Sequence, residues 1–267
     1  MIKKKNLAIS IILSILLLFN AAYAEKEEKK QKKEKGKKYF SSTSFSALLT
    51  SGNSKNFTFS IDTDQNLHIG KNSFNFKGKI IYARSDKEKK SEIYFSTLKY
   101  NFHLNSRTYL LGLTKFDRNV LAGYNSRFAV SAGAGYTWLK REKIDISSEA
   151  AFGWSTENNA ERITQQFINN DNIIKKPNIS SSFVSAIISS KIICNVSSTT
   201  KLMHQEILFI SLKELAGYRI NSYFSISVSI SPQLALKTSI QISYENKPVP
   251  GYKSTDLFML SSIVFKI

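Results

Sequence analysis

Apolar and polar residues alternate along most of this chain, and the alternation is clear in residues 57–67. Phe57 and Ile61 fall on one face of that segment, whereas Thr58 and Asp62 fall on the other. Because successive side chains of a β-strand point to opposite faces, this segment meets an apolar surrounding on one side and water on the other. The pattern recurs to the C-terminus with almost no helical periodicity, which predicts an all-β protein.

Turn signals divide the chain into about twelve strands, each near the 9 to 11 residues that a tilted strand needs to span a bilayer. Short and long connections alternate, as in outer-membrane barrels with short periplasmic turns and long outward loops. An even strand count then places both termini in the periplasm. The sequence predicts a closed, antiparallel transmembrane β-barrel; aromatic residues near both rims favour it over the alternative, a soluble sandwich. The expected strands are 40–50, 56–69, 73–84, 92–103, 108–118, 127–140, 144–155, 181–193, 200–212, 217–230, 234–245 and 254–267.

The N-terminal residues have the features of an export signal. Three lysines, Lys3 to Lys5, precede an apolar run from Leu7 to Phe19, and Ala22-Tyr23-Ala24 has the small-x-small pattern that signal peptidase cleaves. The apolar run is short for a membrane helix, which needs about 20 residues. We therefore expect residues 1–24 to be a cleaved signal peptide, with an uncleaved anchor as the alternative.

Residues 25–38 carry eight Lys and four Glu and no apolar residue. Such a segment cannot bury a core, which predicts a disordered charged leader. The barrel would then occupy residues 39–267, and the protein would lie in the outer membrane of a Gram-negative-type bacterium. We expect it to contact outer-membrane lipid, lipopolysaccharide and the barrel assembly machinery.

Charge and residue usage exclude several function classes. The net charge of +18 includes the signal and the leader, and no recognition helix or stacking motif indicates a nucleic-acid partner. The single Cys194 excludes an internal disulfide. His68, His103 and His204 are scattered, without the spacing of metal ligands, so no cofactor is expected.

One turn predicts a strand register. If Gly70-Lys71 is a two-residue hairpin turn, Asp64 faces Lys77 and Asp62 faces Lys79 on the polar face. Cross-strand pairs of opposite charge stabilise a sheet by a few tenths to about 1 kcal/mol each. These four residues either hold the barrel wall together or set the charge and width of a narrow lumen.

Four short segments carry a further signal: Leu49 to Ser54, Phe116 to Arg118 with Ala122 to Arg127, Gly133 to Tyr136, and Tyr244 to Gly251 with Thr255-Asp256. In this order they resemble a family of exported proteins catalogued as domain of unknown function 481, whose members are often named salt-induced outer membrane proteins. The resemblance covers roughly residues 43 to 267. It implies an outer-membrane barrel and supplies no reaction, ligand or catalytic residue.

The second of these segments is expected to form an outward loop at 119–126. Outward loops carry function in many barrels, so the segment provides candidate binding residues. The ones singled out are Asp117, Arg118, Tyr124 and Arg127.

Three functions remain open on the sequence. A structural or surface-interaction barrel without enzymatic activity is the first, and a narrow pore for small solutes is the second. Lysines on the predicted lumen face, such as Lys99 and Lys237, would give such a pore an anion preference. A lipid hydrolase is the third, but it needs a nucleophile beside an oriented base, and no histidine has that setting in the sequence.

Overall fold

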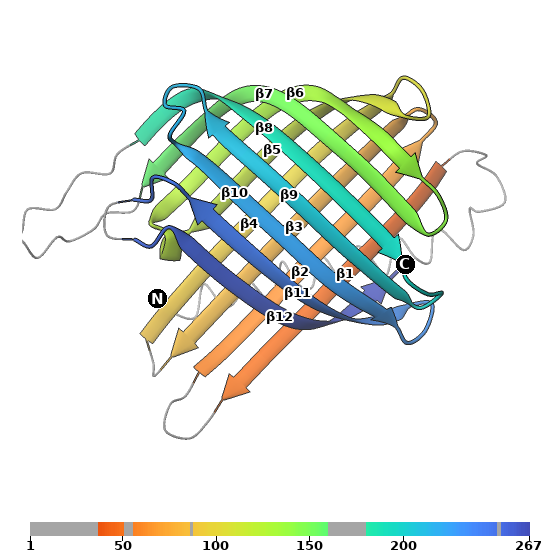
Figure 1. The fold of residues 1–267 in the computed structure, drawn as a ribbon. Helices are drawn as coiled ribbons and strands as arrows, with labels where there is room; N and C mark the ends of the chain where they lie inside the picture. Colours follow the sequence, from red (N-terminus) through yellow and green to blue (C-terminus); the bar gives the residue numbers. More distant parts are fainter. Residues whose placement is uncertain (1–36, 51–55, 86–87, 160–179, 250–251) are drawn as a thin grey trace, which may run out of the picture.

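Twelve antiparallel strands form one closed barrel in the computed structural model, which describes residues 37–50, 56–85, 88–159, 180–249 and 252–267 (Figure 1). The signal peptide and all of the charged leader except Lys37 and Lys38 lie outside the described residues. The strands are β1 (Lys37–Thr50), β2 (Asn56–Ile69), β3 (Asn72–Ser85), β4 (Glu88–His103), β5 (Thr108–Asn119), β6 (Tyr124–Lys140), β7 (Ile144–Asn159), β8 (Ser180–Asn195), β9 (Thr200–Ser211), β10 (Tyr218–Ser229), β11 (Leu234–Glu245) and β12 (Thr255–Lys266).

Every strand pairs with its neighbours in the chain, and β1 closes the ring by pairing with β12. The closing seam is short, since its register runs only from Ser42 opposite Lys266 to Phe45 opposite Ile263. By contrast, β1 pairs with β2 along its whole length. The prediction of a closed antiparallel barrel of about twelve strands is confirmed.

The links between strands define two ends of the barrel. The turn end carries the short links at 70–71, 104–107, 141–143, 196–199 and 230–233, together with the start of β1 and the end of β12. The loop end carries the remaining links. Three of these are shorter than expected, because β4 begins at Glu88 rather than residue 92, β6 begins at Tyr124 rather than residue 127, and β7 ends at Asn159 rather than residue 155. Residues that were expected in loops therefore belong to strands of the barrel wall.

The two faces of the wall differ in chemistry. Large apolar side chains project outward, among them Phe152 (63% exposed), Trp138 (61%) and Leu257 (66%). The inward face is mostly polar and charged, with apolar clusters such as Phe183, Ile187 and Phe209. This alternation is what a strand needs when lipid lies on one side and a wet lumen on the other. In the part of the chain that the structure describes, no helix is long and apolar enough to cross a membrane.

Candidate functional site

The lumen holds a cavity of about 1230 Å³ that reaches both ends of the barrel. At the turn end it is lined by residues such as Thr199 and Lys266, and at the loop end by Lys253 and Asp256. Charged side chains of both signs line it between these ends. The lumen is therefore the place to look for a functional site.

The predicted register of the first hairpin is confirmed. Asp64 lies opposite Lys77 and Asp62 lies opposite Lys79 in the β2–β3 ladder. The ammonium and carboxylate groups are 3.8 Å apart in the first pair and 3.7 Å apart in the second. All four residues line the lumen cavity. Whether they regulate passage or only stabilise the wall stays a prediction.

Charged residues at the loop end lie side by side on adjacent strands. Asp117 on β5 lies opposite Arg127 on β6, which in turn lies opposite Glu157 on β7. On the other side of the lumen, Arg219 on β10 lies opposite Glu245 on β11. Alternating charges along a row of strands stabilise the ladder, since each residue has an opposite charge beside it.

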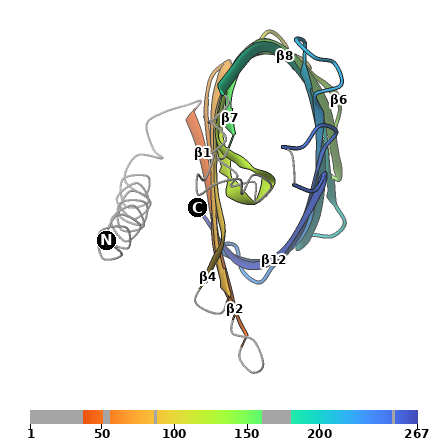
Figure 2. The ribbon, with the colours of Figure 1, turned by 90° about the vertical axis from the view of Figure 1, so that its left-hand side faces the viewer.

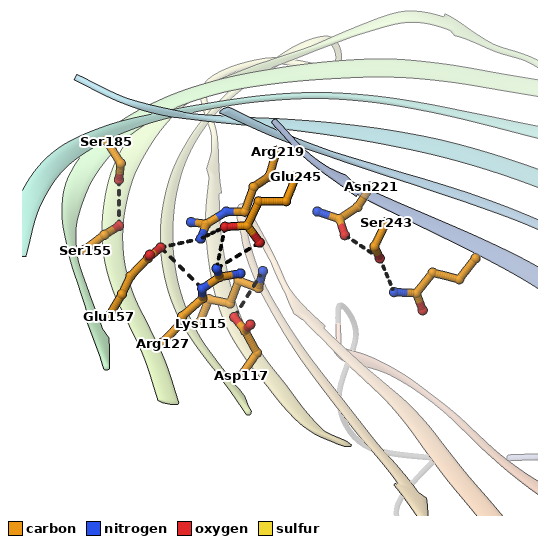
Figure 3. Close-up of polar contacts among 11 residues, drawn as sticks. Lys115, Asp117, Arg127, Ser155, Glu157, Ser185, Arg219, Asn221, Ser243 and Glu245 are labelled. Carbon is orange, nitrogen blue, oxygen red and sulfur yellow. Dashed lines mark hydrogen bonds and ion pairs between the residues drawn. The ribbon is translucent and has the colours of Figure 1, made fainter. Parts of the chain in front are cut away.

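The two rows meet across the lumen (Figure 3). Nη2 of Arg127 donates to both carboxylate oxygens of Glu245, at 2.8 and 3.0 Å. Nη1 of Arg219 forms an ion pair with Glu157, whose carboxylate also lies 3.5 Å from Nε of Arg127. Strands β8 and β9 separate β7 from β10 in the ring, so these contacts span a chord of the barrel. We call Arg127, Glu157, Arg219 and Glu245 the strut.

Aromatic rings support both arginines of the strut. The Arg127 guanidinium lies 3.4 Å from the centroid of the Tyr124 ring, and that of Arg219 lies 4.0 Å from the Phe209 ring. The arginine side chains are only 8% and 14% exposed. Guanidinium groups in such surroundings are stabilised by carboxylates and by ring faces together, because each loses much of its water shell.

Two links at the loop end contact each other beside the strut. A short 3-10 helix, η1 (Val120–Ala122), ends at Gly123, whose φ of 84° lies in the left-handed region. A Cβ at Gly123 would lie 2.6 Å from the ring of Tyr252 and 2.9 Å from Cβ of Val249, so the β11–β12 link packs against this turn. Figure 2 shows the yellow-green η1 segment within the ring of strands. The strut and these links narrow the loop end.

The link expected at 119–126 is shorter in the structure. Asp117 and Arg118 belong to β5 and Arg127 belongs to β6, as the expected strands had them, and Tyr124 also belongs to β6; all four line the lumen. The prediction that Tyr124 lies in the loop is therefore wrong, and a binding role for the four residues stays a prediction. Register shifts after Asp117 and after Tyr124 re-aim the chain here, and Nη1 of Arg118 donates to the carbonyl of Asn125 at 3.3 Å. Such bulges turn side chains that plain alternation would place elsewhere.

The rest of the lumen carries more positive than negative charge. On the strands between the strut and the turns, seven lysines and three carboxylates line the cavity. One carboxylate is firmly held, since Glu149 accepts from Nζ of Lys99 at 2.6 Å and from the Tyr109 hydroxyl at 2.8 Å. The lysines are Lys77, Lys79, Lys99, Lys115, Lys201, Lys237 and Lys266, and the carboxylates are Asp62, Asp64 and Glu149. Of these lysines, Lys115 pairs with Asp117, which lies level with the strut, at 3.3 Å.

The chain matches a known protein family over most of its length. Residues 43–267 match the family described as Protein of unknown function, DUF481. The chain belongs to this family. No curated protein matches it.

One solved structure supports the fold of this DUF481 member. It is similar to the translocator domain of the autotransporter NalP from Neisseria meningitidis, with a TM-score of 0.50 and 10% identity over 94% of this chain and 98% of that one. An outer membrane channel from Pseudomonas putida F1 aligns with a TM-score of 0.48 and 11% identity over 88% and 96% of the two chains. At 10% identity the likeness to the translocator domain concerns the fold alone, which is that of an outer-membrane barrel.

Two histidines of the DUF481 barrel have a serine or a carboxylate nearby. Oγ of Ser73 lies 3.2 Å from Nε2 of His103, but no carboxylate orients this histidine among the described residues. Nε2 of His204 lies 3.2 Å from Glu206, and the serine on that carboxylate, Ser222, contacts Glu206 rather than the histidine. A Ser-His-acid triad needs the histidine between the other two groups. Within the described ranges, no three His, Cys, Asp or Glu residues are grouped as a metal site.

Proposed function

We propose that the protein is an outer-membrane barrel that forms a narrow channel for small anionic solutes, constricted at its loop end by the strut. The observation that carries the proposal is the lumen cavity, which reaches both ends and is lined by seven lysines against three carboxylates on the strands between the strut and the turns. A lumen with excess positive charge and low-dielectric walls concentrates anions and repels cations.

Residence in the outer membrane rests on two features. The outward face carries large exposed apolar side chains on all sides, which are stable only against lipid or another apolar surface. The export signal in residues 1–24 supplies the route out of the cytoplasm. In this proposal the turn end faces the periplasm and the loop end faces outward.

The strut would act as a size filter. Its ion pairs cross the lumen, and the links that bear Gly123 and Tyr252 pack beside it. A solute would have to pass through the space that these groups leave open, so only small solutes are expected to cross. The lysines between the strut and the turn end would attract an anion to that passage.

The test is single-channel conductance of the processed chain in a planar bilayer, with ion selectivity from a salt gradient. We expect stable steps that favour anions, and a reduced anion preference in Lys201→Gln/Lys237→Gln, because both lysines line the lumen away from the strut. The matched control is Lys213→Gln in the exposed β9–β10 link, which should leave selectivity unchanged. Steps without anion preference would refute the anionic part of the proposal.

A non-conducting barrel with a structural or surface role is the second candidate. The observation that favours it is the low exposure of the strut arginines, which would fit a closed loop end. An inserted, heat-modifiable barrel that stays silent under voltage would support this candidate and refute the channel.

A further inference from the structure

A polar cluster interrupts the apolar outward face on β8, β9 and β10. Met203, Gln205 and Ile207 line the lumen, so the intervening side chains of His204 and Glu206 project outward. Glu206 lies opposite Ser190 on β8 and opposite Ser222 on β10. This places two ionisable groups and two hydroxyls on the lipid side of the wall, near the middle of β9. We call these four residues the outer polar cluster.

The cluster has unused hydrogen-bonding capacity. Oγ of Ser222 donates to Oε1 of Glu206 at 2.5 Å, and Nε2 of His204 lies 3.2 Å from the same oxygen. The other oxygen, Oε2, has no hydrogen-bond partner among the residues that the structure describes. Ser190, on the far side of the carboxylate, is exposed. The Glu206 side chain is 39% exposed, so the carboxylate is open toward the surroundings of the barrel.

Lipid tails cannot form hydrogen bonds with the polar groups of this cluster. Ionisable groups that face the hydrocarbon region are expensive, and those that persist are usually paired or functional. Most outward side chains around the cluster are aliphatic or aromatic, and the outward hydroxyl of Ser148, which lies opposite Ser190 on β7, accepts a hydrogen bond from Trp138. The exposed apolar neighbours are Ile188, Ile192, Ile220, Phe224 and Ile226.

We propose that the β8–β10 face binds a second copy of this chain through the outer polar cluster. His204 and Glu206 lie on one face of the same strand, two residues apart. When both copies are inserted the same way, the two-fold axis runs along the membrane normal and each tilted β9 crosses the β9 of the other copy. His204 of one copy then lies diagonally across from Glu206 of the other, so the surface is its own complement. Oε2 of Glu206 then gains a donor, either the imidazole or the hydroxyl of Ser190. Between apolar surfaces in a membrane, polar contacts of this kind provide much of the association energy.

The test measures Förster transfer between copies of the processed chain in phosphatidylethanolamine–phosphatidylglycerol vesicles, over a range of protein-to-lipid ratios. Dyes are attached to Ser198→Cys in a Cys194→Ser background, in the turn that joins β8 to β9. We expect saturable transfer for the unmodified cluster. His204→Glu sets like charges against each other and should weaken dimerisation by about tenfold or more.

A charge swap makes the test specific. His204→Glu/Glu206→His restores self-complementarity and should restore transfer, although it alters the same positions. Ser96→Glu, on the outward face of β4, is the control for adding a carboxylate to the lipid face and should leave transfer unchanged. Heat-modifiable gel mobility establishes that each variant is folded. Three results would overturn the proposal. Energy transfer could rise only as expected for random crowding, it could be unaffected by His204→Glu, or it could be lost in His204→Glu and not recovered in His204→Glu/Glu206→His.

Discussion

The strut can be tested by a double-mutant cycle on Arg127 and Glu245. The two side chains come from β6 and β11 and contact each other across the lumen through two hydrogen bonds of 2.8 and 3.0 Å. The variants are Arg127→Met, Glu245→Gln and the double substitution. The cycle reports the coupling free energy of this one pair, since the effects of each residue on the rest of the barrel cancel.

The structure sets the expected magnitude. A hydrogen bond to a charged group contributes about 1.5–3 kcal/mol net to the free energy of unfolding. Both bonds here share one nitrogen, and Glu245 retains Arg219 at 4.0 Å when Arg127 is removed, so the two bonds do not add fully. The Arg127 side chain is 8% exposed and that of Glu245 is 20% exposed, so water screens the pair only weakly. We expect a coupling free energy of about 2 kcal/mol.

Reversible urea unfolding in lipid vesicles provides the assay, with fluorescence of Trp138 and Trp154 as the signal because both rings face outward. The matched control is the same cycle on Lys247 and Glu214, whose ion pair is 52% and 57% exposed. That pair should couple by less than about 0.5 kcal/mol, as exposed ion pairs do. A coupling of Arg127 with Glu245 as small as that of the control pair would refute the view that the strut is desolvated and spans the lumen.

Two glycine substitutions test how the links and the wall are packed. Gly123→Ala should widen the loop end and raise conductance in a planar bilayer, because its Cβ would collide with the ring of Tyr252. Gly70→Ala is the control: Gly70 has a φ of 58° and open space around it, so the variant has the left-handed strain of about 1–2 kcal/mol without a collision. Its conductance should be unchanged. Gly153→Ala should abolish heat-modifiable folding, because its Cβ would lie 2.0 Å from a backbone oxygen of β6, whereas Gly112→Ala meets nothing within 4 Å and should fold. Normal folding of the Gly153 variant would contradict the close approach of β6 and β7.

The sequence predicted the fold and one register well, for local reasons. A strand that separates lipid from water carries its own period, so most strands could be placed from alternation alone. The β2–β3 register depends on a two-residue turn at Gly70, whose φ of 58° suits such a turn, and the pairing of Asp64 with Lys77 follows by counting. Neither inference needs contacts between distant parts of the chain.

The strut could not be predicted in the same way. Arg127 and Glu245 are 118 residues apart, and their contact depends on the curvature of the closed ring and on two bulges beside η1. Glu157 fell outside the expected strand 144–155, because β7 continues to Asn159. Alternation could place Arg219 on the lumen face, but not opposite Glu157 across it. The motif around Asp117 resembled a loop because its glycine and polar residues are typical of turns.

The outer polar cluster was missed because β9 has no clear apolar face. Met203, Ile207 and Phe209 are apolar but point into the lumen, while His204 and Glu206 are ionisable and point toward lipid. A strand with mixed residues on both faces has a weakly specified orientation until its neighbours determine it. The two ionisable residues at alternate positions were the signal that the sequence contained.

The barrel is a ring of paired strands, and the short seam between β1 and β12 is its weakest pairing. Every other pairing joins strands that follow each other in the chain, so each closes a small loop. The seam alone must close a loop that contains almost all of the strands, at an entropic cost of about 5 kcal/mol from the logarithm of the loop length. Its register pairs four residues of each strand, from Ser42 with Lys266 to Phe45 with Ile263, and Ser41 and Ile267 add two backbone hydrogen bonds of 2.9 Å beside them. Resistance of the barrel to opening therefore depends on the short β1–β12 pairing, rather than on the total length of the other strand pairings.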